Sequence, residues 1–287
     1  MELITYDKEK CDCCGLCTAV CVCDVQTQKG NKEIPEVIHP ENCIVCGHCV
    51  AVCPNDAIIH HKIDVNNMVP INHAEINEGN MENFLSSKRS VRHFSNKPVA
   101  RGVIEKLIGV ACKAPSADNN QDRTFVVVTD PKKIQQIEDA IVEKLREKSS
   151  ELRRELKQMN ATSPMIQTLE TLIWSFALTI TQAERGETPV FRSAPCVIFI
   201  YAPQDDWSGN PLARDDCVLA QDYLMLQAYA MGLGTCIIGY AELFPEVVAE
   251  YLDIPEGYKL YCVTILGYPK YKYQKTVDRN PSKIVWL

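Results

Sequence analysis

The sequence predicts an α+β protein in which a small cysteine-rich domain precedes a larger domain of helices and strands. Ten of the fifteen cysteines fall before residue 54, so they are not distributed like a disulfide framework. The chain has 287 residues, which leaves room for a second domain with a large core of its own. Beyond residue 80, apolar residues at helical spacing alternate with short β-prone runs.

Two cysteine runs share the spacing C-x2-C-x2-C-x3-C. They are Cys11, Cys14, Cys17 and Cys21, and then Cys43, Cys46, Cys49 and Cys53. Three thiolates on a tight loop can hold three corners of a 4Fe–4S cube, and in two-cluster ferredoxins the last cysteine of each run ligates the other cluster. The spacing therefore predicts two 4Fe–4S clusters. The expected ligands are Cys11, Cys14, Cys17 and Cys53 for cluster one, and Cys43, Cys46, Cys49 and Cys21 for cluster two.

A zinc site is the alternative interpretation of so many cysteines. Zinc-binding chains usually show two CxxC pairs rather than runs of three plus one, so clusters are favoured. The first run differs from the second in two ways. Cys21 lacks the proline that follows Cys53, and two additional thiols, Cys13 and Cys23, lie close by. Cys23 could replace Cys21 as a ligand, and the role of Cys13 stays open.

Three histidines accompany the second cysteine run. His48 lies inside its loop, where a hydrogen bond could tune the reduction potential of the cluster. His60 and His61 follow the run, and a surface position is favoured over a ligand role for both.

The charge distribution narrows the range of partners. The net charge is −7, and residues 1–60 carry nine Asp or Glu against four Lys, so −5 lies in the first fifth of the chain. This argues against nucleic acid and for a basic docking face on a redox partner. The amino terminus does not read as a signal peptide, and the longest apolar stretch, 171–180, is about half of a membrane span. We expect a cytoplasmic protein that does not enter the membrane.

The cysteine-rich domain is expected to cover residues 1–61 and to contain only short elements. Residues 2–6 and 57–61 are β-prone and flank the cysteine runs, so we expect them to pair. Residues 32–38 are a weaker strand candidate.

A linker and a basic segment lead into the larger domain, residues 80–287. Residues 62–79 lack periodicity and are rich in Asn, which favours a linker. Asn80 is a suitable N-cap for a helix over 81–87. Three cations and a hydroxyl follow: Lys88, Arg89, Ser90 and Arg92. Such a cluster suits a phosphate group, although a solvated basic turn is the favoured interpretation of this segment taken alone.

Helices and strands then alternate. Apolar residues at helical spacing predict a helix over 99–111, which ends at the polar turn 114–121. Residues 125–129 read as a buried strand. Asp130 is expected to cap the next helix, with Pro131 as its first residue.

Residues 131–190 contain two helical patterns. One apolar stripe runs from Ile134 to Met159 and another from Met165 to Ile180. Simple packing is the favoured interpretation of the second stripe. The alternative is a lid over a site or a contact with a partner subunit, because a helix that is apolar most of the way round must be covered. A further helix over 214–231 is apolar on most sides, and we expect it to be fully buried.

Several segments, in order, resemble the nitroreductase family of FMN enzymes. They are KRSVRHF, APSADNNQ leading into FVVV, APCVIFIY, RDDCVLAQDYLMLQAYAMGLGTCIIG, IPEGYKLYCVTILGYP, and the arm containing Arg279-Asn280-Pro281. The resemblance covers about residues 80–287, with 131–190 as a helical insertion. With the cysteine-rich domain in front, the chain is similar to the ferredoxin–nitroreductase fusions of anaerobic bacteria and archaea.

This resemblance implies a mixed sheet flanked by helices in a domain-swapped homodimer. The helix over 214–231 would lie at the dimer core, and the C-terminal arm would wrap the partner. It also implies FMN as a cofactor. The residues expected to contact FMN are Lys88, Arg89, Ser90, Arg92 and Arg279 at the phosphate and ribityl chain, Pro115, Ser116 and Asn119 in the polar turn, and Ile238 and Gly239 near the flavin N5.

The expected activity follows from the number of electrons that each group carries. Clusters move one electron at a time, whereas a nitro group, quinone or activated alkene takes electrons in pairs, and a flavin accepts both modes. We expect an oxidoreductase that passes electrons from a low-potential donor, a ferredoxin-like protein or NAD(P)H, through two clusters to FMN and then to a small organic acceptor. The alternatives are an NAD(P)H-dependent flavin reductase with auxiliary clusters, and an electron-transfer or redox-sensing protein without a dedicated substrate.

Overall fold

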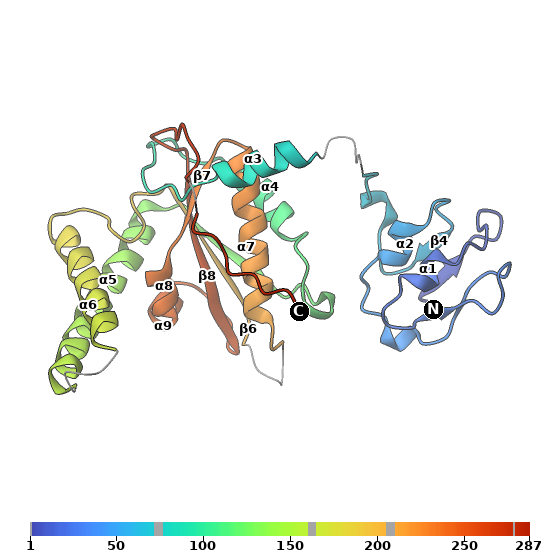
Figure 1. The fold of residues 1–287 in the computed structure, drawn as a ribbon, viewed down its shortest axis with the longest axis horizontal. Helices are drawn as coiled ribbons and strands as arrows, with labels where there is room; N and C mark the ends of the chain where they lie inside the picture. The colour runs from blue at the N-terminus through green and yellow to red at the C-terminus, as the bar shows by residue number, and fades with distance from the viewer. Residues whose placement is uncertain (1, 72–76, 160–164, 205–209, 278) are drawn as a thin grey trace. The chain divides into compact units, whose positions relative to one another are not determined.

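The computed structural model has two compact units (Figure 1). One comprises residues 1–77 with 118–120, and the other comprises 78–117 with 121–287. Within them, the structure describes residues 2–71, 77–159, 165–204, 210–277 and 279–287. No helix in these ranges is both long enough and apolar enough to cross a membrane.

The first unit is built from short elements. They are β1 (Ile4–Tyr6), α1 (Leu16–Ala19), β2 (Gln26–Thr27), β3 (Glu36–Val37), η1 (Pro40–Asn42), α2 (His48–Val52), β4 (Ile58–His60) and η2 (Val65–Asn67). β1 pairs antiparallel with β4, which confirms the predicted pairing of 2–6 with 57–61. The strand expected in 32–38 is limited to β3, which pairs with β2.

An internal repeat governs this unit, because 32 positions separate Cys11 from Cys43 and the backbone repeats at that interval. Gly15 (φ 74°) and Gly47 (φ 75°) each precede a short helix in the left-handed conformation that favours glycine. Asp24 (φ 49°) and Asp56 (φ 50°) are a second left-handed pair. The two cysteine loops therefore have matching conformations.

The predicted linker, 62–79, contains Asp64, whose side chain accepts a hydrogen bond from the Asn66 N–H and caps η2. Residues 72–76 of the predicted linker lie outside the described residues. α3 (Glu78–Ser87) begins earlier than predicted, with an acidic residue in its first turn where the helix dipole favours negative charge. Asn80 therefore lies inside the helix, and its prediction as the N-cap is wrong.

The second unit is organised around a four-stranded sheet in the order β5-β6-β8-β7. The strands are β5 (Thr124–Val128), β6 (Cys196–Pro203), β7 (Gly234–Ile237) and β8 (Tyr258–Gly267). All three neighbouring pairs run antiparallel. The parallel component is the isolated bridge between Ser90 and Thr235, where the Val91 N–H donates to the Thr235 carbonyl at 2.9 Å. The basic segment is thereby fixed beside β7.

Helices cover both faces of this sheet (Figure 1). α4 (Arg101–Ala111) and α7 (Ala213–Ala230) share one apolar cluster with Ile198 and Ile200 of β6. α5 (Pro131–Gln158), α6 (Ile166–Glu184), α8 (Gly239–Leu243) and α9 (Pro245–Ala249) contribute to the other cluster, with Val197 and Phe199. Alternate residues of β6 point to opposite faces of the sheet. Because helices cover both faces, β6 is buried on both sides and is apolar along most of its length.

The two helices predicted within 131–190 are present as α5 and α6, which pack together. Asp130 caps α5 as predicted, with its carboxylate accepting from the Lys132 N–H at 2.9 Å. The inward residues of α6, including Ile173 and Phe176, are buried in the core, which fits simple packing of that stripe. The outward Trp174 is 66% exposed in the single chain.

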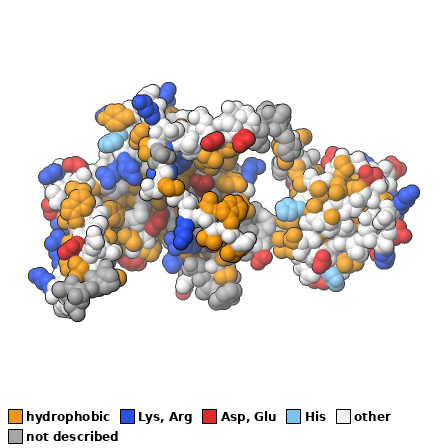
Figure 2. Space-filling model, viewed as in Figure 1, with side chains coloured by type: hydrophobic (Ala, Val, Ile, Leu, Met, Phe, Trp, Pro, Cys, Tyr) orange, Lys and Arg blue, Asp and Glu red, His pale blue; other side chains and the backbone are white. Residues whose placement is uncertain are grey.

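The prediction that the helix over 214–231 is fully buried is wrong for the single chain. Cys217 and Leu224 face the core and are buried, but Leu219 on the other side of α7 is 41% exposed, and Val218 and Tyr223 are exposed beside it. The sheet and α4 cover only one side of this helix. In Figure 2, hydrophobic side chains are exposed on the face of the second unit where α7 and the C-terminal arm lie.

Candidate functional site

Nine of the ten cysteines of the first unit line two cavities, and Cys13 lines neither. Cavity one contains Cys11, Cys14, Cys17 and Cys53. Cavity two contains Cys21, Cys23, Cys43, Cys46 and Cys49. Each cavity joins three cysteines of one run to the last cysteine of the other run. This is the grouping expected of a ferredoxin with two 4Fe–4S clusters.

Backbone donors favour Cys21 over Cys23 as the counterpart of Cys53. The Val25 N–H lies 3.4 Å from the Cys21 Sγ, and the Ala57 N–H lies 3.3 Å from the Cys53 Sγ, at equivalent points of the repeat. All fifteen cysteines are free of disulfides. Among the described residues, no group of three or more His, Cys, Asp or Glu is arranged to hold a single metal ion.

His60 is buried, with only 2% of its surface exposed, so the surface position favoured from the sequence is wrong. It lines cavity two, and its Nε2 lies 3.5 Å from the Cys43 Sγ. Burial lowers the pKa of His60. The period of a strand was the signal that could have found it, because Ile58 and His60 point to the same buried face of β4 while Ile59 points outward. His48 also lines cavity two but is exposed.

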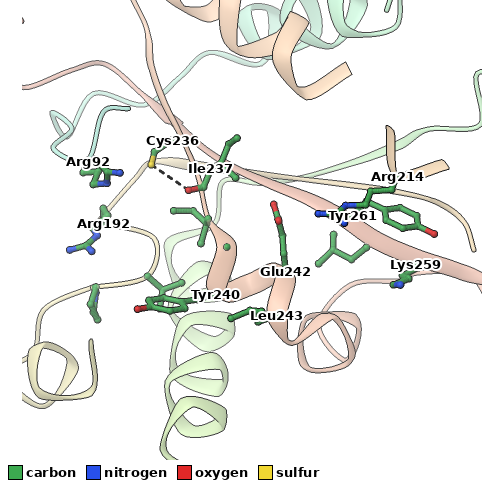
Figure 3. Close-up of a pocket in the computed structure, with 15 residues that line it drawn as sticks. Arg92, Arg192, Arg214, Cys236, Ile237, Tyr240, Glu242, Leu243, Lys259 and Tyr261 are labelled. Atoms are coloured by element: carbon green, nitrogen blue, oxygen red, sulfur yellow. Dashed lines mark hydrogen bonds between the residues drawn. The ribbon is translucent and has the colours of Figure 1, made fainter. Parts of the chain in front are cut away.

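The second unit has a cavity of about 620 Å³ at the end of β7, called here the β7 cavity (Figure 3). Three residues predicted to contact FMN meet in its lining: Arg92 from the basic segment, and Ile238 and Gly239 after β7. A Cβ added at Gly239 would meet no atom within 4 Å, so its backbone faces open space. This leaves room for a flat ring to approach the peptide.

The rest of the basic segment does not line the β7 cavity but lies directly beside β7. Arg89 has a buried Nε without a hydrogen-bond partner among the described residues, while its guanidinium donates to the Ser86 carbonyl. Burial lowers the pKa of Lys88, whose Nζ lies 4.0 Å from the Met225 Sδ. A buried donor without a partner is costly unless a ligand accepts the bond. The segment therefore fits an anionic group such as a phosphate.

The remaining predicted FMN contacts are not in the lining that the described residues form. Pro115 and Ser116 belong to the turn after α4, where the Ser116 hydroxyl accepts from the Gln121 N–H at 3.1 Å. Asn119 groups with the first unit rather than the second. Arg279 lies in the exposed C-terminal arm. One copy of the chain thus brings together only part of the predicted FMN set.

Sequence reasoning missed several cations of the β7 cavity. Figure 3 shows Arg92 and Arg192 toward one end of the cavity, and Arg214 and Lys259 toward the other. Glu242 is the acidic side chain of the lining, and burial raises its pKa. Arg192, Arg214 and Lys259 come from a loop, from the first turn of α7 and from β8, so no single local motif marks them together.

The 131–190 segment makes hydrogen bonds to residues that form the wall of the β7 cavity. Glu138 of α5 is buried and accepts from the N–H groups of Val190 (2.9 Å) and Phe191 (3.2 Å), just before Arg192. The hydroxyl of Tyr240, which lines the cavity, lies 2.5 Å from the Ser175 Oγ of α6. The insertion therefore positions two parts of the lining. A carboxylate within the apolar stripe of α5 was the sequence signal for such a contact.

Comparison with known proteins now identifies the family. The family model described as the nitroreductase family matches residues 85–268, more than half of the chain. The chain belongs to the nitroreductase family. A 4Fe-4S binding domain matches residues 36–59. The predicted fusion of a ferredoxin-type domain with a nitroreductase-family oxidoreductase is confirmed.

The relatives are distant but extend over most of the second unit. A protein of Archaeoglobus fulgidus, named as a candidate NADH dehydrogenase/NAD(P)H nitroreductase, is 25% identical over 205 residues, or 69% of this chain and 92% of its own. An iodotyrosine deiodinase of Haliscomenobacter hydrossis is 24% identical over 186 residues, or 65% and 78%. A nitroreductase structure with bound FMN from Desulfitobacterium hafniense has a TM-score of 0.51 at 22% identity, covering 74% of this chain and 100% of that one. This last likeness shows the nitroreductase-like fold.

Proposed function

We propose that this protein is an FMN-dependent oxidoreductase that two 4Fe–4S clusters in the same chain supply with electrons. It would work in the cytoplasm, taking electrons from a low-potential donor and passing them to a small organic acceptor of the nitroaromatic, quinone or activated alkene type. One observation carries the proposal: two cavities lined by cysteines and a nitroreductase-family unit with a cationic cavity occur in one chain.

The cysteines would divide between the clusters as their cavities do. Cys11, Cys14, Cys17 and Cys53 would hold cluster one, and Cys43, Cys46, Cys49 and Cys21 would hold cluster two. The paired N–H···S contacts at Cys21 and Cys53 support this assignment, because backbone donors stabilise a thiolate. Bacterial-type clusters of this kind transfer single electrons, at potentials on the order of −400 mV if they resemble other ferredoxins.

FMN would lie in the β7 cavity and along the basic segment. The partnerless Nε of Arg89, together with Lys88, Ser90 and Arg92, suits its phosphate. The open backbone at Gly239 suits its ring system. When bound, FMN supplies hydride transfer and converts single electrons into pairs. The other lining cations, Arg192, Arg214 and Lys259, make the cavity electropositive and would stabilise a more negative reduced flavin or an anionic acceptor.

A homodimer would complete the site. Pro115, Ser116, Asn119 and Arg279 do not join the β7 cavity within one chain, so a second copy would supply them. The exposed apolar side of α7, with Val218, Leu219 and Tyr223, is a suitable surface for that copy. We propose neither nucleic acid nor membrane as a partner, since the chain is acidic overall.

Direct reduction by NAD(P)H is the second candidate function, with the clusters as auxiliary groups. The observation that favours it is the name of the Archaeoglobus fulgidus relative, which includes NADH and NAD(P)H. An electron carrier without a substrate is less well supported, because a cavity of about 620 Å³ at the proposed flavin site has room for an acceptor.

Anaerobic turnover with three donors separates these functions. Holoprotein would be assayed with a quinone and either reduced ferredoxin, NADH or NADPH. We expect turnover with reduced ferredoxin, and a decrease of about tenfold or more in Cys46→Ser because a cluster ligand is lost. Cys112→Ser is the control, since Cys112 is exposed and lies outside both cysteine cavities. Full activity with NAD(P)H alone that Cys46→Ser leaves unchanged would support the second function instead.

A further inference from the structure

We propose that His60 donates a hydrogen bond to the Cys43 thiolate and thereby raises the reduction potential of cluster two above that of cluster one. This inference rests on the proposed assignment of two clusters. His60 would act on cluster two through Cys43, without being a ligand itself. The first electron would then reside on cluster two.

The hydrogen-bond partners of His60 determine which ring nitrogen carries the proton. Its Nδ1 accepts from the Lys62 N–H at 3.2 Å. In a neutral imidazole the other nitrogen then bears the hydrogen. That nitrogen, Nε2, lies 3.5 Å from the Cys43 Sγ, within hydrogen-bond range for sulfur. A thiolate bound to iron has no S–H to donate, so the histidine must be the donor.

The side chain of His60 is also fixed in place. It is 2% exposed, and its backbone pairs with Ile4 in the register of β1 and β4. Rotation of the ring away from Cys43 would break the hydrogen bond that its Nδ1 accepts from the Lys62 N–H. The His60 Nε2–H would therefore stay directed at the Cys43 Sγ in both redox states, and the side chain would not need to reorganise.

The two cavities differ in the residues that the paired strands β1 and β4 contribute to them. Their fourth cysteines each receive one backbone N–H, so that contribution is balanced between Cys21 and Cys53. On the paired strands, cavity two is lined by Ile4 and His60, whereas cavity one is lined by Tyr6 and Ile58. The Tyr6 hydroxyl donates to Gln26 rather than to a cysteine. The residues that line cavity one include no histidine.

This asymmetry has a defined consequence for electron transfer. Reduction adds one negative charge to a cluster, and a donor aimed at a ligand sulfur stabilises that charge. The electron moves without a proton, because the ring keeps its hydrogen throughout. An electron that enters at cluster one would therefore pass on to cluster two. One such bond should favour reduction of cluster two by roughly threefold to tenfold, which corresponds to about 28 to 59 mV for one electron.

The test compares His60→Leu with His61→Leu in redox titrations of the holoprotein followed by EPR. His61 is adjacent but exposed, and its contact is with Thr5 rather than a cysteine. We expect His60→Leu to lower one of the two cluster potentials by about 28 to 59 mV and to leave the other unchanged. His61→Leu should leave both unchanged. Equal shifts of both clusters, or no shift, in His60→Leu would overturn the proposal.

A measurement on the wild type covers the case in which His60→Leu does not assemble. Protein labelled with ¹⁵N-histidine would be reduced stepwise, and pulsed EPR would detect nitrogen coupled to the clusters. We expect a weak histidine coupling in the signal that appears first. No coupling, a coupling only in the later signal, or one strong enough for direct ligation would each overturn the proposal. Iron analysis distinguishes failure of the His60 proposal from failure of the two-cluster assignment. About four rather than eight iron atoms per chain would refute the two-cluster assignment itself.

Discussion

Arg89 is the residue whose surroundings point most directly to an anionic ligand. Its Nε is buried and has no hydrogen-bond partner among the described residues, although the guanidinium is always charged. The neighbouring Val91 N–H is bonded to β7, so the segment cannot move freely to expose the group. A phosphate at this point would satisfy the donor.

Replacing this side chain should weaken FMN binding while leaving the fold intact. Arg89→Ala removes a charge-assisted hydrogen bond worth about 1.5 to 3 kcal/mol, which is roughly 10- to 150-fold in Kd. Arg101→Ala is the matched control, because Arg101 is exposed and paired with Glu105 at 2.7 Å. Fluorescence titration of the apoprotein with FMN gives both values. Equal affinities in the two variants would remove Arg89 from the phosphate site.

The ligand choice between Cys21 and Cys23 is a second question at this scale. Only Cys21 has the backbone donor that mirrors the donor at Cys53. Cys21→Ala should therefore lower the iron content from about eight atoms per chain toward four, and Cys23→Ala should leave it unchanged. Iron and sulfide analysis of the purified variants measures this. The reverse pattern would exchange the two assignments.

Single residues could be placed from the sequence where a motif fixes their spacing, and were missed where the fold decides their environment. The spacing groups the eight cysteines of the two runs as the two cavities do. Arg92, Ile238 and Gly239 were matched through motifs and meet in one cavity. His60 was missed, although the alternation along β4 places it on the same buried face as Ile58. Arg192 and Lys259 carry no local signal, since distant segments bring them together.

At the scale of elements, α7 presents the clearest sign of a missing neighbour. Its inner side is part of the core, yet its outer side exposes Val218, Leu219 and Tyr223. Exposed apolar groups of this kind mark interaction surfaces. The alternative subunit contact is α6, where Trp174 is exposed.

A glutamate introduced on the exposed face of α7 or of α6 tests which helix forms the subunit interface. Leu219→Glu should weaken the proposed homodimer by about 2 to 3 kcal/mol, roughly 30- to 150-fold in Kd, because the carboxylate would be desolvated. Trp174→Glu should leave the dimer intact. Sedimentation of the wild type and both variants, with a chain mass of 32.3 kDa, reports the state. Dissociation of the Trp174 variant alone would move the interface to α6.

The positions of helices along the chain could be predicted from the sequence more readily than their burial or the order of the strands in the sheet. Helical spacing marked α4, α5, α6 and α7, and the Asp130-Pro131 cap marked the start of α5. The complete burial predicted for α7 is wrong for the single chain, since burial depends on what covers a helix and not only on its composition. The strand order β5-β6-β8-β7 was equally out of reach, because the antiparallel pairing of β6 with β8 joins residues far apart in the chain.

At the scale of the whole molecule, the family match and the cysteine cavities describe two redox units in one chain. The acidic balance of residues 1–60 favours a donor with a basic docking face. In the proposed function, tethering would keep the clusters at a high effective concentration relative to the flavin, which a separate ferredoxin would lack. The fusion itself was predicted from motifs in both halves, because cysteine spacing and family segments are local features.

Anaerobic stopped-flow tests the central claim, the transfer of electrons from clusters to FMN, most directly. Oxidised holoprotein would be mixed with reduced ferredoxin while cluster and flavin absorbance are followed separately. We expect the clusters to bleach first and the flavin to follow, with the flavin phase about tenfold or more slower in Cys46→Ser than in Cys112→Ser. Flavin reduction that precedes the clusters, or that runs at the same rate in both variants, would contradict the account.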